Sequence, residues 1–176
     1  MQGAGASKIY NRAMFELKTA SAQSKPALYA GLLEQAQALL TGERDRIANA
    51  ANLAALIWHT LPDLNWAGFY FFDGTELVLG PFQGKPACVR IAMGRGVCGT
   101  AAQKRETVMV SDVHQFPGHI ACDSASNSEI VLPLLLGDRV LGVLDLDSPR
   151  VGRFDDEDRR GLEPLARLWV SASDHH

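Results

Sequence analysis

The sequence predicts an α+β protein in which helices at both ends of the chain flank a central, mostly antiparallel sheet of about six strands. Apolar residues recur every three to four positions in the first third of the chain and again near its end, which is typical of helices. From Asn65 onward, short apolar segments alternate with turn residues, which is typical of strands. Because the chain has 176 residues, we expect a single domain over residues 1–176.

The helical third extends over about residues 7–61. Two of its segments, 25–40 and 44–61, are rich in alanine and leucine and repeat apolar residues at helical spacing. We also expect a shorter and weaker helix over Ser7 to Ala22. A last helix over about 155–171 follows the sequence FDDED, whose acidic residues suit the positive end of the helix dipole.

The sheet region covers about residues 65–147. Its aromatic and β-branched segments are separated by glycine, proline and aspartate, which delimit strands. The predicted strands are residues 65–72, 76–82, 88–93, 106–113, 129–136 and 139–147. A short helix near 97–104 separates the third strand from the fourth, and a long loop at 114–128 separates the fourth from the fifth.

The composition excludes several classes of partner. Hydrophobic residues make up 47% of the chain and charged residues 21%, with a net charge of -3. Because lysine and arginine are dispersed, we expect neither nucleic acid nor an anionic membrane as a partner. The sequence has no apolar segment long enough to span a bilayer and no signal peptide, so we expect a cytoplasmic protein.

The chain has three cysteines, Cys88, Cys98 and Cys122. A small, odd number of cysteines argues against the disulfide framework of a secreted protein. Because none of them belongs to a C-x-x-C pair, we also expect no metal site.

The neighbours of each cysteine bear on its reactivity. Cys122 lies in a polar loop, where His119 would favour the thiolate and Asp123 would oppose it. A lysine and an arginine lie within three residues of Cys88, and positive neighbours lower the pKa of a thiol. Cys98 lies at a predicted helix start, where packing alone explains it.

Two carboxylates end the last predicted strand. Asp145 and Asp147 are two residues apart and therefore share one face. A three-residue hairpin loop would place Glu129 on that face, whereas a two-residue Gly-Asp turn would place it on the opposite face. A bulge at Pro133 would change this count, so the sequence leaves the question open. Clustered carboxyl groups raise one another's pKa, so that one of them can donate a proton near neutral pH.

Trp66 and Tyr70 lie on one face of the first predicted strand, with Gly68 between them. Most aromatic pairs of this kind pack in a core. The same pair also suits a small apolar group such as a methylthio unit, because sulfur packs well on aromatic rings.

The sequence GRGVCG at 94–99 matches the G-x-G-x-x-G pattern of dinucleotide sites. The helix that follows is too short for a usual crossover, and a hairpin follows in place of further strand–helix–strand units. We therefore favour a tight turn and helix start, whose backbone amides could hold a carboxylate.

Four segments between about residues 65 and 149 together resemble the free methionine-(R)-sulfoxide reductases, small single-domain proteins with a GAF fold. The segments are NWAGFYFF, LVLGPFQGKPACVRIAMGRGVCGTAA, DVHQFPGHIACDSASNSEIVLPL and GVLDLDSP. All three cysteines lie at the family's positions, and the helical flanks also suit the family.

The resemblance implies a role for each candidate residue. Cys122 would be the nucleophile, Cys88 the resolving cysteine and Cys98 an auxiliary thiol. Trp66 and Tyr70 would contact the methyl and sulfur end of the substrate. Three carboxylates would bind the substrate's ammonium group and act on the sulfoxide oxygen as catalytic groups, namely Glu129, Asp145 and Asp147.

The resemblance also implies the reaction, which is reduction of free methionine-(R)-sulfoxide to methionine through a thiol, a sulfenic acid and a disulfide. Thioredoxin would be the electron donor, the protein would be a homodimer, and no cofactor would be required. An acidic cluster opposite backbone amides would bind both charged ends of a free amino acid, which a peptide-bound methionine lacks.

Two other functions compete with this one. A GAF domain can bind a small ligand without catalysis, although such sensor modules usually accompany an output domain, for which this chain leaves no room. A thiol peroxidase also forms a sulfenic acid and resolves it with a second cysteine. Thiol titration with methionine sulfoxide and with hydrogen peroxide would separate the three readings.

Overall fold

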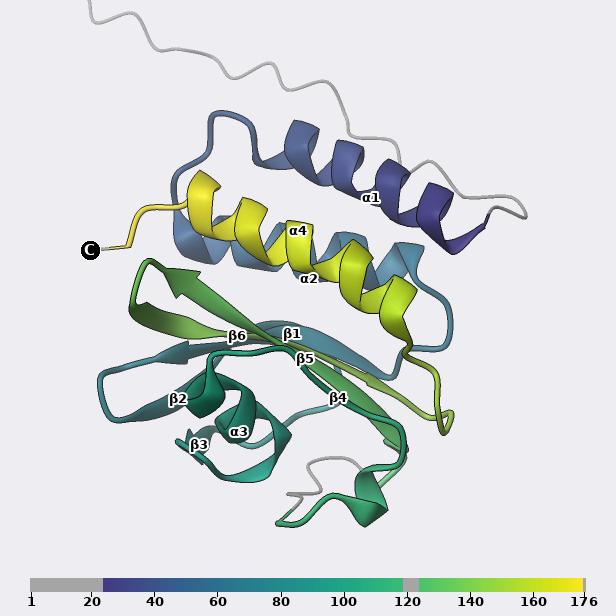
Figure 1. The fold of residues 1–176 in the computed structure, drawn as a ribbon. Helices are drawn as coiled ribbons and strands as arrows, with labels where there is room; N and C mark the ends of the chain where they lie inside the picture. The colour runs from purple at the N-terminus through teal and green to yellow at the C-terminus, as the bar shows by residue number, and fades with distance from the viewer. Residues whose placement is uncertain (1–23, 119–123, 176) are drawn as a thin grey trace, which may run out of the picture.

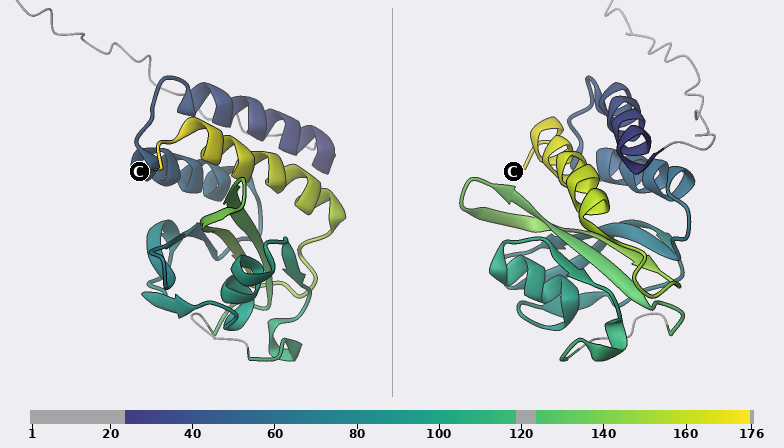
Figure 2. Two further views of the ribbon diagram at one scale, coloured as in Figure 1. Left: turned by 60° about the vertical axis from the view of Figure 1, so that its left-hand side comes forward. Right: turned by 45° about the vertical axis from the view of Figure 1, so that its right-hand side comes forward.

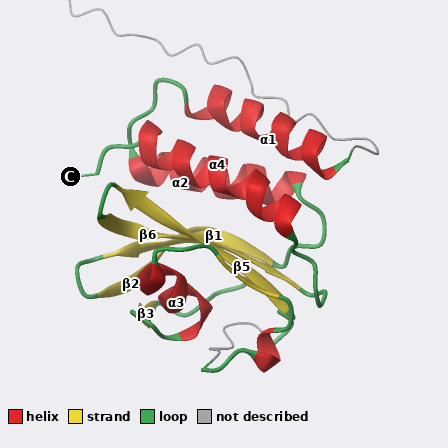
Figure 3. Ribbon diagram, in the orientation of Figure 1, coloured by secondary structure: helices red, strands yellow, loops and turns green. Residues whose placement is uncertain are grey.

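The computed structural model describes residues 24–118 and 124–175 and confirms the α+β fold. Helices α1, α2 and α4 cover one face of a six-stranded sheet, and α3 lies on the other face (Figures 1 and 2). Colouring by secondary structure shows this layering directly (Figure 3). The helices are α1 (Lys25–Leu40), α2 (Arg46–Thr60), α3 (Gly96–Lys104) and α4 (Asp156–Ala172). The helix predicted at Ser7–Ala22 lies outside the described residues.

The strands lie in the order β3-β2-β1-β6-β5-β4, and neighbouring strands are antiparallel throughout. β3 and β4 are shorter than predicted because each is an edge strand with a partner on one side only. The chain between them crosses from one edge of the sheet to the other and carries α3 over the face (Figure 1). The strands are β1 (Trp66–Phe72), β2 (Glu76–Gly84), β3 (Arg90–Ala92), β4 (Val108–Val110), β5 (Ser128–Leu136) and β6 (Arg139–Ser148).

The β5–β6 hairpin resolves the question of register. Its turn is the two-residue Gly137–Asp138, which alone would place Glu129 on the face opposite Asp147. Leu141 of β6 has no opposite residue on β5, and this one-residue bulge shifts the register so that Glu129 pairs with Asp147. Pro133 pairs in register, so the bulge lies on the other strand from the one considered in the sequence.

A glycine makes this bulge possible. Gly142, next to the bulge, has a φ of 152°, and a Cβ added there would lie 2.0 Å from the backbone oxygen of Tyr70 on β1. Only glycine avoids this collision between β6 and β1. The register of the candidate site residues therefore depends on a backbone feature outside the site.

The sheet separates two hydrophobic cores. The larger one lies under α1, α2 and α4 and includes the fully buried side chains of Phe69 and Trp169. The smaller one lies between the sheet and α3 and includes Trp66, Tyr70 and Cys98. Alternate residues of β1 thus supply both cores, as expected for a strand covered on both faces.

The helical layer is joined by a buried polar network around Asp158 of α4. Its carboxylate accepts hydrogen bonds from Lys25 Nζ at 2.6 Å, Tyr29 Oη at 2.7 Å and Arg153 NH1 at 2.9 Å. Asp158 is fully buried, so these partners offset the cost of removing its charge from water. In the described part of the chain, no helix has the length and apolar character needed to cross a membrane.

Candidate functional site

A pocket opens on the α3 side of the sheet. It encloses about 540 Å³ not occupied by atoms, a volume that includes space open to solvent. Strands β1, β5 and β6 form its floor, and the start of α3 forms one wall. The residues that line it are Trp66, Tyr70, Pro86, Ala87, Ile91, Arg95, Gly96, Val97, Cys98, Ser126, Glu129, Asp145 and Asp147.

The strand register brings the three predicted carboxylates to this pocket. Glu129 pairs with Asp147, and Asp147 pairs with Trp66 on the other side of β6. Asp145 lies two residues earlier on β6 and points to the same face. Glu129 is only 7% exposed and Asp145 only 6%. A face that is otherwise apolar therefore carries two buried acidic groups.

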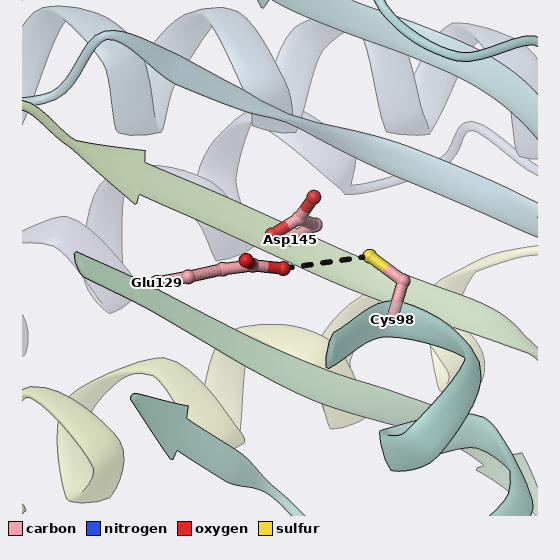
Figure 4. Close-up of side chains that lie close together, drawn as sticks. All are labelled: Cys98, Glu129 and Asp145. Atoms are coloured by element: carbon pink, nitrogen blue, oxygen red, sulfur yellow. Dashed lines mark hydrogen bonds between the residues drawn. The ribbon is translucent and has the colours of Figure 1, made fainter. Parts of the chain in front are cut away.

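Cys98 reaches this acidic group from α3. Figure 4 shows its thiol and the carboxyl group of Glu129 pointing toward one another, with Asp145 beside them. The Sγ atom of Cys98 donates a hydrogen bond to Oε1 of Glu129 at 3.9 Å. One possible ligand atom from each of these three residues lies within 4.8 Å of the others, so the group could hold a cation, either a metal ion or an ammonium group.

Burial and mutual repulsion change how these groups ionise. Burial, followed by the negative charges of Asp145 and Asp147, raises the pKa of Glu129 well above its usual range. Burial raises the pKa of Asp145 to about 7. The pKa of the Cys98 thiol is also raised, first by burial and then by the two carboxylates. At neutral pH the cluster therefore holds a proton that an ordinary exposed carboxylate would have lost.

The predicted aromatic pair lies on β1, and its two rings form an aromatic wall of the pocket. The rings of Trp66 and Tyr70 are stacked with centroids 5.8 Å apart, and Phe82 of β2 stacks on Trp66 at 5.3 Å. Trp66 Nε1 donates to the backbone oxygen of Lys85 at 3.2 Å, and Tyr70 Oη donates to that of Cys88 at 3.0 Å. These two hydrogen bonds tie the aromatic wall to the segment between β2 and β3.

The glycine-rich segment forms the turn and helix start that the sequence favoured. Gly94 and Gly96 have φ values of 77° and 61°, which glycine adopts readily. The side chain of Arg95, the N-cap residue of α3, makes no capping hydrogen bond, and the first residues of the helix line the pocket. An anionic group could bind there.

The three cysteines differ in state. Cys88 is half-buried and disulfide-bonded. Cys98 is a buried free thiol. Cys122 lies outside the described residues, and so do its neighbours His119 and Asp123.

Two lining residues were not singled out in the sequence. Ser126 is buried, and its Oγ accepts a hydrogen bond from Asn65 Nδ2 at 3.0 Å. Arg95 is exposed at the start of α3. The sequence could have pointed to Ser126 as a site residue only through its place four residues after Cys122. Nothing in a single sequence shows that a serine in a loop is buried in a pocket.

Comparison with known proteins places this geometry in context. A family model described as "GAF domain" matches residues 48–172. A protein of Escherichia coli (strain K12) named "Free methionine-R-sulfoxide reductase" is 55% identical over 142 residues, covering 81% of this chain and 86% of the relative.

Two solved structures have the same fold as this chain. The free methionine-R-sulfoxide reductase from Neisseria meningitidis, in complex with its substrate, is 46% identical with a TM-score of 0.86, and the match covers 90% of this chain and 95% of that one. A protein of Burkholderia vietnamiensis described as a GAF sensor is 66% identical with a TM-score of 0.83, covering 86% and 96%. Similar proteins therefore carry both a reductase name and a sensor name.

Proposed function

The chain belongs to the GAF-domain family of free methionine-R-sulfoxide reductases, and we propose that it reduces the free amino acid through the thiol of Cys122 and the pocket beside α3. The reaction converts methionine-(R)-sulfoxide to methionine. The observation that carries the proposal is the buried carboxyl pair Glu129 and Asp145, which shares one pocket with a stacked aromatic wall.

The pocket offers a complementary group for each part of the substrate. Asp145 Oδ1 is buried and has no hydrogen-bond partner among the described residues, so an ammonium group would satisfy it. The uncapped N-terminus of α3 would receive the α-carboxylate. Trp66 and Tyr70 would contact the methyl and sulfur end. A peptide-bound methionine has neither charged end, which explains a preference for the free form.

The chemistry needs a nucleophile and an acid. The Cys122 thiolate attacks the sulfoxide sulfur, and the carboxyl cluster of Glu129 and Asp145 supplies a proton to the sulfoxide oxygen. The sulfur–oxygen bond breaks, methionine leaves, and Cys122 carries the oxygen as a sulfenic acid. The sulfur of the substrate is reduced by two electrons and that of Cys122 is oxidised by two.

A second thiol completes the cycle. The thiol of Cys88 condenses with the sulfenic acid of Cys122, which releases water and forms a disulfide. The disulfide-bonded state of Cys88 supports this assignment. Thioredoxin, as the dithiol donor, then reduces the disulfide by exchange. Thiols supply both electrons, so the reaction calls for no metal or organic cofactor. Cys98 serves as an auxiliary thiol.

Single-turnover chemistry tests the cysteine roles. The pre-reduced protein is mixed with racemic free methionine sulfoxide, and methionine, the remaining epimer and the disulfide are quantified together. The Cys122→Ser variant is expected to release no methionine, whereas Cys88→Ser releases one equivalent per site and then fails to turn over with thioredoxin. Full thioredoxin-coupled turnover by Cys122→Ser would contradict the proposal.

The sensor name of the Burkholderia relative supports one alternative, a GAF domain that binds a small ligand without chemistry. Unchanged thiols and unchanged sulfoxide in the experiment above would favour it.

We further propose that residues 1–176 form one domain and that the protein acts as a cytoplasmic homodimer. Sedimentation of the purified protein tests the dimer.

A further inference from the structure

The proposed reaction places an unusual demand on the pocket. A sulfoxide oxygen accepts hydrogen bonds and donates none, so it cannot lie against ionised carboxylates without a donor. Three of the lining side chains are carboxylic acids, namely Glu129, Asp145 and Asp147. Beyond the proton that the carboxyl cluster supplies, any further hydrogen-bond donor to the sulfoxide oxygen must come from the other lining residues.

Most polar hydrogens of these residues already have acceptors. The indole N–H of Trp66 and the hydroxyl of Tyr70 donate to backbone oxygens. The thiol of Cys98 donates to Glu129. If any of these three groups turned to a ligand, it would break a hydrogen bond that it already makes.

Ser126 is different. Its Oγ accepts a hydrogen bond from Asn65 Nδ2, so its own hydroxyl proton must point elsewhere. Within residues 24–118 and 124–175, nothing accepts that proton, although Ser126 is only 4% exposed and lines the pocket. A buried hydroxyl that faces a pocket in this way is a preset donor for a ligand.

Asn65 holds this donor next to the aromatic wall. Its backbone N–H donates to the carbonyl oxygen of Asp147 at 3.0 Å, which ties it to the end of β6. Ser126 and Trp66 line the same pocket, and the Asn65–Ser126 hydrogen bond ties Ser126 to the residue that directly precedes Trp66. Arg95 and the start of α3 belong to the other wall, which suits the α-carboxylate.

We propose that the hydroxyl of Ser126 donates a hydrogen bond to the sulfoxide oxygen of the substrate, and that Asn65 is a positioning residue that orients this hydroxyl. The inference rests on the proposed reductase function. Through this hydrogen bond Ser126 distinguishes the sulfoxide from the methionine product, which has no oxygen on its sulfur. The same hydrogen bond holds the oxygen while the carboxyl cluster gives it a proton.

The test compares two ligands in proteins that cannot turn over. In the Cys122→Ser background, the affinities for methionine-(R)-sulfoxide and for methionine are measured by calorimetry, with and without Ser126→Ala. Loss of one neutral hydrogen bond is expected to weaken sulfoxide binding about 3- to 10-fold and to leave methionine binding unchanged. Ser124→Ala, an exposed serine of the same loop, is the matched control and is expected to change neither affinity.

A second variant keeps the hydroxyl but redirects it. Asn65→Asp replaces the amide donor by an acceptor of similar size, so the serine proton turns toward the new carboxylate. It is expected to cause the same selective loss as Ser126→Ala, and the double variant is expected to lose no more than either single one. If Ser126 and Asn65 had only a structural role, the variants would weaken the binding of both ligands to the same extent.

The outcomes separate the two proposals. Equal losses for both ligands would mean that Ser126 contacts the amino-acid end, and no loss for either would mean that it contacts neither; both results overturn the inference. If the Cys122→Ser protein binds neither ligand and the parent protein releases no methionine, the reductase function itself fails.

Discussion

Replacement of Asp145 by asparagine is expected to make the protein more stable above neutral pH and much less active. In the folded protein the pKa of Asp145 is about 7, against an ordinary value of 3.8, because burial disfavours its charged form. Between about pH 4 and pH 7 the unfolded chain has lost this proton and the folded protein still holds it. The unfolded state binds fewer protons, so stability falls as pH rises through this window.

The size of the effect follows from the two pKa values. A difference of roughly three pKa units corresponds to about 4 kcal/mol, all of it lost above pH 7. The amide of Asp145→Asn stays neutral, so this variant loses none of that stability. The two proteins are expected to be nearly equal near pH 4 and to differ by about 3 to 4 kcal/mol at pH 8, with turnover reduced at least about 100-fold.

Urea unfolding followed by tryptophan fluorescence at several pH values from 4 to 8 measures the difference. Asp138→Asn is the matched control, since Asp138 is fully exposed in the hairpin turn, and its effect is expected to stay within about 0.5 kcal/mol. A stability difference for Asp145→Asn that does not change with pH would refute the burial argument.

The other predictions concern the backbone and the helical layer. Gly142→Ala is expected to destabilise the protein by at least about 3 kcal/mol in urea unfolding, because its Cβ would collide with the backbone oxygen of Tyr70. Gly137→Ala, at a positive φ but with nothing within 4 Å of the added Cβ, is expected to cost only about 1 kcal/mol; equal effects would contradict the assigned contact. Asp158→Asn is expected to cost about 3 kcal/mol in the same assay, since it leaves the buried guanidinium of Arg153 without its anionic partner. If that variant were as stable as the parent protein, the ion pair would make no net contribution to the free energy of unfolding.

Much of the fold was predictable because it depends on local patterns. The helix predicted at 25–40 is observed with the same limits, and the α2 helix starts two residues late because the Asp45 side chain accepts hydrogen bonds from two backbone N–H groups of its first turn. The edge strands β3 and β4 were predicted too long. Cys88, Met93 and Val113 lie beyond the observed strands and belong to the hydrophobic core that also contains α3 residues. Single-sequence patterns do not distinguish such packing from strand pairing.

The sequence by itself determined which chemical groups the chain can use: three thiols, an aromatic pair on one strand face, and two carboxylates two residues apart at a strand end. Alternation along a strand is a local property, so Asp145 and Asp147 had to share a face. The tertiary structure decided whether Glu129 joins them. A one-residue bulge at Leu141 turns a register that would separate the carboxyl groups into one that clusters them.

The tertiary structure alone also decided the pKa values of the carboxyl groups and the place of Ser126 in the pocket. The pKa of Asp145 is about 7 because the fold buries its carboxyl group. The buried hydroxyl of Ser126 gains its orientation from Asn65, a residue far away in the chain. Burial and long-range hydrogen bonds depend on which segments meet in space, and local sequence patterns carry no information on that meeting.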